Sequence, residues 1–178
     1  IVVGAYQEDS DGTDQSNDNY SSAGAAYIFE RDNSTGWPST ETKFLKSPTP
    51  VVNGNFGIAV SINENYIVIC EKGTNSAYIY ERDSTTGWPD TPTKQITAGD
   101  ASALGFGSSI AMNDNRIVIG AQDSKSAYIF DKDPSTGWPD TSTIKLLPLV
   151  DTTEFGRSVA IHENVIGVGA RQGYKAFV

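Results

Sequence analysis

One phrase occurs three times in this chain of 178 residues, and the repetition constrains the fold more than any other feature. The copies are DNSTGWPSTETK from Asp32, DSTTGWPDTPTK from Asp83 and DPSTGWPDTSTIK from Asp133. A catalytic motif is normally written once per site, so a phrase that returns at a regular interval indicates a unit of architecture. The sequence therefore predicts a repeat protein.

A Phe-Gly pair marks the start of each unit, and an apolar segment follows it at a fixed distance. The pairs begin at Phe56, Phe106 and Phe155, which are 50 and 49 residues apart. Eleven residues after each Phe come IVICE from Ile67, IVIGA from Ile117 and IGVGA from Ile166. The third segments are AYIYERD from Ala77, AYIFDKD from Ala127 and AFV from Ala176, and a partial first unit carries IVVGA from Ile1 and AYIFERD from Ala26.

Each complete unit reads as four short strands. The first strand alternates, with Ile58, Val60 and Ile62 on one face. The second is apolar on both faces, as expected for a strand covered on both sides, and the fourth, around residues 94–97, is the least apolar and is expected at an outer edge. We expect Asn65, Asn115 and Asn164 to adopt the left-handed conformation in the turns between first and second strands. We expect Gly36, Gly87 and Gly137 to permit the turns before the fourth strands.

Four-stranded antiparallel units repeated every forty to fifty residues are typical of a β-propeller, in which each unit is a blade. We therefore expect an all-β chain of about three and a half blades in one segment, residues 1–178, with units 1–50 (partial), 51–99, 100–149 and 150–178 (partial). Propellers usually close with at least four blades, and commonly with six or seven. The sequence thus favours part of a larger propeller; the alternative is a chain whose ends pair across a seam.

Phe-Gly opens each complete unit, and Gly-Ala closes most of the second strands, as in Gly4-Ala5 and Gly120-Ala121. On these motifs the whole chain resembles the FG-GAP repeat family, whose members include the propeller of integrin α subunits. The chain departs from the family pattern at Cys70-Glu71, in the replacement of the family's Pro after Gly-Ala, and in the short turns where integrin-type repeats often carry an Asp-rich calcium loop. The resemblance implies an extracellular or cell-surface, non-catalytic module for adhesion or surface assembly.

The first unit contains a long acidic excursion that offers a candidate calcium loop. Asp9, Asp11 and Asp14 supply carboxylates around the turn residue Gly12, and calcium takes six to eight oxygen ligands. The loop has neither the final Glu nor the flanking helices of an EF-hand. A solvated acidic loop is therefore the favoured interpretation, with calcium as the alternative and the only cofactor that the sequence suggests.

The repeated Trp37, Trp88 and Trp138 bring a large ring to the same place on successive units. We favour a structural role at the ends of the blades; the alternative is a set of platforms for a glycan, as in a lectin-like propeller. Solvent-facing rings would support that alternative and buried rings would oppose it. Asn19-Tyr-Ser and Asn33-Ser-Thr match the N-glycosylation pattern in expected surface loops.

Little in the chain suggests catalysis. His162 is the only histidine and stands where other units carry Asn, and Cys70 is the only cysteine. No serine lies in a nucleophile elbow and no glycine-rich phosphate loop precedes a helix. We expect no enzyme activity, while the scaffold portion of a larger surface enzyme stays open as an alternative.

The net charge of −9 excludes a nucleic-acid partner, because no basic stripe is present to contact phosphates. No apolar run is long enough for a membrane span. The expected partners are a protein, further blades or copies of the same assembly, or a glycan.

Overall fold

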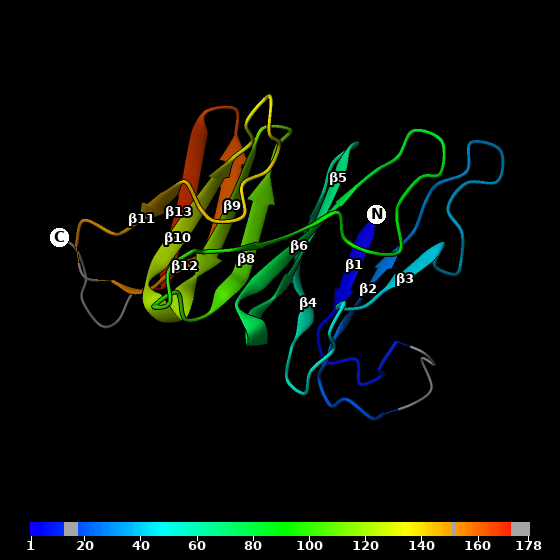
Figure 1. The fold of residues 1–178 in the computed structure, drawn as a ribbon, viewed down its shortest axis with the longest axis horizontal. Coiled ribbons are helices and arrows are strands. Elements are labelled where there is room, and N and C mark those ends of the chain that lie inside the picture. The colour runs from blue at the N-terminus through cyan, green and yellow to red at the C-terminus, as the bar shows by residue number, and fades with distance from the viewer. Residues whose placement is uncertain (13–17, 151, 172–178) are drawn as a thin grey trace.

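The computed structural model describes residues 1–12, 18–150 and 152–171, and these form four antiparallel sheets (Figure 1). Sheet 1 contains β1 (Val2–Ala5), β2 (Ala25–Ile28) and β3 (Lys43–Leu45). Sheet 2 contains β4 (Phe56–Ile62), β5 (Tyr66–Glu71), β6 (Ser76–Glu81) and β7 (Lys94–Thr97). Sheet 3 contains β8 (Phe106–Met112), β9 (Arg116–Ala121), β10 (Ser126–Asp131) and β11 (Ile144–Leu146). Sheet 4 contains β12 (Thr153–His162) and β13 (Val165–Arg171), and short 3₁₀ turns occur at Lys72–Thr74 and Gln122–Ser124.

The all-β prediction is confirmed, and so is the order of strands within a unit. Sheets 2 and 3 each run from first strand to fourth strand in chain order, with the fourth strands β7 and β11 at an edge. The expected strand AFV from Ala176 lies outside the described residues. The described sheets form no closed ring. No helix among the described residues is long and apolar enough to cross a membrane.

The sheets pack face to face, which explains why the second strands are apolar on both sides. In β5, Ile67 and Ile69 belong to a core cluster shared with Ile28 of sheet 1, while Val68 belongs to a cluster shared with Ile119 of sheet 3. All six residues of β5 are buried. The second strand β5 thus lies between two neighbouring sheets.

The glycine of each Phe-Gly pair lets one sheet approach the next. Gly57 has a φ of +84°, and a Cβ at this position would lie 2.2 Å from the Ala25 carbonyl oxygen of sheet 1. Gly156 repeats the arrangement against Ser126 of sheet 3, again at 2.2 Å. Any larger residue at these positions would push the two sheets apart.

The repeated phrase forms a hairpin turn before each fourth strand. In the second unit, Asp83 Oδ1 accepts hydrogen bonds from the backbone N–H groups of Thr85 (2.8 Å) and Thr86 (2.7 Å). Gly87 closes the turn with a φ of +79°, as predicted. Asp32 and Asp133 hold the same turn in the first and third units.

The predicted left-handed conformation of Asn65, Asn115 and Asn164 is wrong, because none of the three has a positive φ. The turn in sheet 2 is held instead by Asn63, whose Oδ1 accepts hydrogen bonds from the N–H groups of Asn65 (3.0 Å) and Tyr66 (2.7 Å). A side-chain acceptor therefore replaces the special backbone conformation.

Candidate functional site

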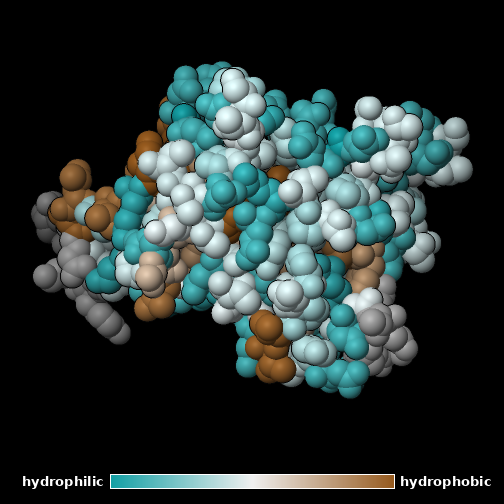
Figure 2. Space-filling view, in the orientation of Figure 1, coloured by the Kyte–Doolittle hydropathy of each residue, from teal (hydrophilic) through white to brown (hydrophobic). Residues whose placement is uncertain are grey.

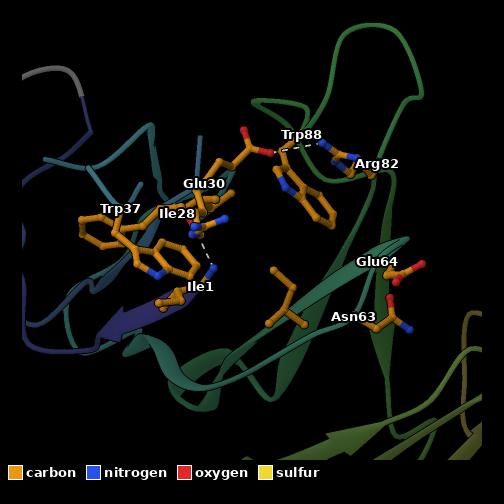
Figure 3. Close-up of a pocket in the computed structure, with 11 residues that line it drawn as sticks. Ile1, Ile28, Glu30, Trp37, Asn63, Glu64, Arg82 and Trp88 are labelled. Atoms are coloured by element: carbon orange, nitrogen blue, oxygen red, sulfur yellow. Dashed lines mark hydrogen bonds and ion pairs between the residues drawn. The ribbon is translucent and has the colours of Figure 1, made fainter. Parts of the chain in front are cut away.

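A groove of about 340 Å³ lies between sheets 1 and 2 at the end where the hairpin turns lie (Figure 3). Ile1, Ile28 and Trp37 form its wall on sheet 1, and Trp88 lies opposite. The turn between β4 and β5 contributes polar groups at its mouth. The other lining residues are Phe29, Glu30, Arg31, Ile62, Asn63, Glu64 and Arg82.

A charged pair spans the groove. Arg82 Nη2 lies 3.3 Å from Glu30 Oε1, and both side chains are about half exposed. The guanidinium also lies 5.8 Å from the centroid of the Trp88 ring, within the range of a cation–π contact. An exposed pair of this kind adds little stability, so its groups are available to a ligand at small cost.

The equivalent space between sheets 2 and 3 is filled. There Tyr66 packs edge-on against Trp138, with ring centroids 5.5 Å apart and an interplanar angle of 89°. The Lys132 ammonium lies 4.8 Å from the centre of the Tyr66 ring. Lys132 thus occupies the place that Arg82 has one unit earlier. The Tyr66 ring, which contacts both Lys132 and Trp138, fills the space between sheets 2 and 3.

The three tryptophans do not form a solvent-facing row. Trp88 and Trp138 are each only 6% exposed, whereas Trp37 is 55% exposed. The favoured structural interpretation therefore fits Trp88 and Trp138. Of the three tryptophans, only Trp37 is exposed, and it lies at the groove.

Two acidic side chains at the start of the excursion, Glu8 and Asp9, are engaged by other residues of the first unit. Asp9 Oδ1 accepts a hydrogen bond from the Ser22 N–H at 2.6 Å, and Glu8 pairs with Lys46 at 2.5 Å. Asp14 lies outside the described residues, and Asp11 also makes an interaction. Among the described residues, no cluster of three or more His, Cys, Asp or Glu could hold a metal ion. Calcium binding therefore stays a prediction.

A second polar cluster lies at the opposite end of the units and holds a loop. Asp100 accepts hydrogen bonds from Lys145 Nζ (2.6 Å) and Tyr128 Oη (3.0 Å), and from Ser102. These bonds, that of Lys145 above all, hold the pKa of Asp100 well below its usual range. A carboxylate that is fully engaged in this way is suited to fixing the loop rather than to catalysis.

The remaining candidates lie apart from the groove. His162 is exposed at the end of β12, and Cys70 is buried in β5, where burial raises the pKa of its thiol. The sequon residues Asn19 and Asn33 are both exposed.

Sequence reasoning did not single out Glu30 and Arg82 as site residues. A signal was present, because a basic residue precedes the Asp turn in each of the first three units, at Arg31, Arg82 and Lys132. The basic residue comes directly before the Asp of the hairpin turn and the repeated Trp directly after its Gly, so the two side chains lie on opposite sides of the turn. This placement indicates a recurring contact between a cation and an indole ring.

No protein-family model and no curated protein matches this chain. The likeness to FG-GAP repeats therefore rests on the motifs of the sequence.

Proposed function

We propose that this chain is a non-catalytic interaction module of the FG-GAP type, built from β-propeller blades and acting outside the cell or at its surface. The stacked sheets, the intervals between Phe-Gly pairs and the strand order of sheets 2 and 3 support the propeller architecture. The single observation that carries the function is the groove of about 340 Å³ between sheets 1 and 2, which is lined by the exposed Trp37 and by the half-exposed Glu30–Arg82 pair.

The groove suits one or two side chains of a protein partner. Its volume of about 340 Å³ is at the small end of ligand pockets. Tryptophan and arginine, which line it at Trp37 and Arg82, are the residue types most enriched among interface hot spots. We therefore propose a protein as its partner.

A glycan is the second candidate, and the exposure of Trp37 favours it. An open indole ring stacks on the apolar face of a sugar, and Glu30, Arg31 and Glu64 offer acceptors and donors for hydroxyl groups around the same groove. The burial of Trp88 and Trp138 opposes a row of three Trp platforms, so this candidate is limited to a single site at Trp37.

Binding of the fluorescently labelled chain to cell surfaces distinguishes the two partners. We expect binding that protease treatment of the cells removes, and that Arg82→Ala or Trp37→Ala weakens about tenfold, the scale of a hot spot. Lys43→Ala is the matched control, because Lys43 pairs with Asp90 outside the groove. Loss after glycosidase treatment alone would favour the glycan, and binding that is unaffected by both groove variants would reject the groove.

Secretion from eukaryotic cells tests the proposed location. Asn19 and Asn33 are exposed, so we expect glycan mass that Asn19→Gln and Asn33→Gln remove in turn. A secreted chain without glycan would leave both sequons unused.

A further inference from the structure

A second pocket, of about 260 Å³, lies where the first strands of sheets 2, 3 and 4 begin. These strands, β4, β8 and β12, pack side by side (Figure 1). The pocket is at the Phe-Gly end of the units, whereas the groove between sheets 1 and 2 is at the end of the hairpin turns, so the two sites are separate. The described residues that line the pocket are Ile58, Lys72, Ser108, Gln122 and Arg157.

These five residues come from only two positions of the repeat. Ile58, Ser108 and Arg157 each follow a Phe-Gly pair, and Lys72 and Gln122 each follow a second strand. The Phe-Gly pair is the same in all three units, because it brings the sheets together, but the residue types at the two lining positions differ from unit to unit. Repeat proteins build their binding surfaces on a constant framework in this way.

Backbone packing between the units fixes the walls of the pocket. A Cβ at Gly107 would lie 3.7 Å from the Lys72 Cα, so the end of β5 lies against the start of β8. Ser108 Oγ accepts a hydrogen bond from the Gln122 N–H at 3.2 Å and lies 3.4 Å from the Gly156 carbonyl oxygen of sheet 4. The lining is therefore formed before any ligand arrives, which lowers the cost of binding.

The pocket concentrates positive charge in an acidic chain. Hydrophilic residues cover most of the face that Figure 2 shows, and the net charge is −9. Lys72 and Arg157 nevertheless line the pocket, and no acidic residue of the described part of the chain does so. Asp123 pairs with Lys72 at 3.0 Å and Glu154 pairs with Arg157 at 2.7 Å. All four side chains are partly exposed, and such pairs are weak enough for a ligand to compete with them.

The lining offers the donors that an oxyanion needs. The pair with Glu154 is formed through Arg157 Nη1, and a guanidinium has five N–H donors in a planar fork that matches two oxygens of one anion. Lys72 adds an ammonium group with three donors, and Gln122 adds an amide. Ile58 provides an apolar contact for carbon atoms next to the anionic group.

We propose that this pocket binds a small ligand through an oxyanion, which is a carboxylate, phosphate or sulfate group. Arg157 holds two of its oxygens, and Lys72 neutralises the charge from the neighbouring unit. Charge-assisted hydrogen bonds of this kind are the strong ones in proteins. The volume of about 260 Å³ suits one such group with a few carbon atoms, since it lies below the usual range of ligand pockets.

Nuclear magnetic resonance of the ¹⁵N-labelled 178-residue chain at pH 7 tests the proposal. Sodium phosphate, sodium sulfate and sodium acetate are titrated separately, with sodium chloride holding the ionic strength constant. We expect saturating shifts of the backbone amides of Lys72, Ser108, Gln122 and Arg157, with a Kd on the order of 1 mM. Tighter binding of phosphate or sulfate than of acetate would assign an ester of these acids as the ligand, and the reverse order would assign a carboxylate. Equal shifts with sodium chloride alone, or shifts that do not saturate, would overturn the proposal.

Charge-neutral variants locate the site. Lys72→Gln and Arg157→Gln should each weaken binding of the preferred anion about tenfold, the scale of a hydrogen bond to a charged group. Asp123→Asn should strengthen it about threefold, because an exposed competing carboxylate is removed. A merely structural role of Lys72 would not produce this gain.

Lys94→Gln and Arg116→Gln are the matched controls. Lys94 pairs with Asp140 at 2.9 Å and Arg116 pairs with Asp131 at 2.5 Å, in both cases away from the pocket. Both variants should bind the anion as the unchanged chain does, and circular dichroism shows that each variant is folded. If folded Lys72→Gln and Arg157→Gln chains bind as well as the controls, the anion does not occupy this pocket and the proposal fails.

Discussion

At the scale of single residues, the repeated Asp turns set the response of the fold to acid. Hydrogen bonds from the backbone N–H groups of Thr86 and Thr85 hold the pKa of Asp83 below its ordinary value. The folded carboxylate therefore binds a proton less readily than the unfolded one. Its contribution to stability is complete above the ordinary pKa of about 4 and is lost as the pH falls through the lower pKa of the folded state.

Asp83→Ala should lower the melting temperature at pH 7 by a few degrees, because two N–H groups of the turn lose their acceptor. Asp83→Asn keeps an acceptor oxygen but cannot ionise, so it should reduce the loss of stability in acid. Thermal unfolding followed by circular dichroism at pH 7 and near pH 3 measures both effects. Asp90→Ala is the control, since Asp90 forms only an exposed pair with Lys43. An equal effect of Asp83→Ala and Asp90→Ala would contradict the role of the turn.

Glu71 is a buried carboxylate where the neighbouring sheets carry Ala5 and Ala121. It is 0% exposed, and its Oε2 accepts hydrogen bonds from Tyr78 Oη and Thr74 Oγ1, each at 2.8 Å. Glu71→Ala should destabilise the fold by about 1 to 3 kcal/mol, because two hydroxyl groups lose this acceptor. Tyr78→Phe should then lower the free energy of unfolding by less in the Glu71→Ala variant than in the unchanged chain. Urea unfolding of the double-mutant cycle measures this coupling, and additive effects would show that the bond contributes little.

At the scale of elements, alanine substitutions at two glycines with positive φ distinguish the effect of close packing between sheets from that of backbone strain. A Cβ at Gly87 would meet no atom within 4 Å. Gly87→Ala should therefore lower the free energy of unfolding only by the strain of the left-handed backbone, about 1 to 2 kcal/mol. Gly57→Ala adds a methyl group 2.2 Å from the Ala25 carbonyl oxygen and should cost more than about 4 kcal/mol, an exceptional value for one substitution. Urea unfolding of both variants provides the comparison. Similar losses would mean that sheet 2 can move away from sheet 1.

The same elements show what the sequence could predict. Periodicity placed β4 to β11, and two-sided apolar patterning indicated that β5 and β9 are covered on both faces, because these signals lie within one strand. The exposure of Trp37 and the burial of Trp88 could not be predicted from their similar local phrases, because burial depends on which sheet lies alongside. The Arg82–Glu30 contact was missed for the same reason: its partners come from different units.

At the scale of the whole molecule, each sheet is covered only by its neighbours, so stability is shared along the stack as in other repeat proteins. The two core clusters lie on either side of sheet 2, and one of them joins sheet 2 to sheet 3. Sheets 2 and 3 therefore hold most of the buried apolar surface among the described residues. Sheet 4 exposes most of β13.

Hydrogen exchange followed by mass spectrometry should reflect this gradient. Amides in β5, β6, β9 and β10 should exchange most slowly, and those in β1 and β13 faster, because local opening is easiest where few buried contacts must break. Uniform exchange along the chain would instead indicate that the four sheets open as one cooperative unit.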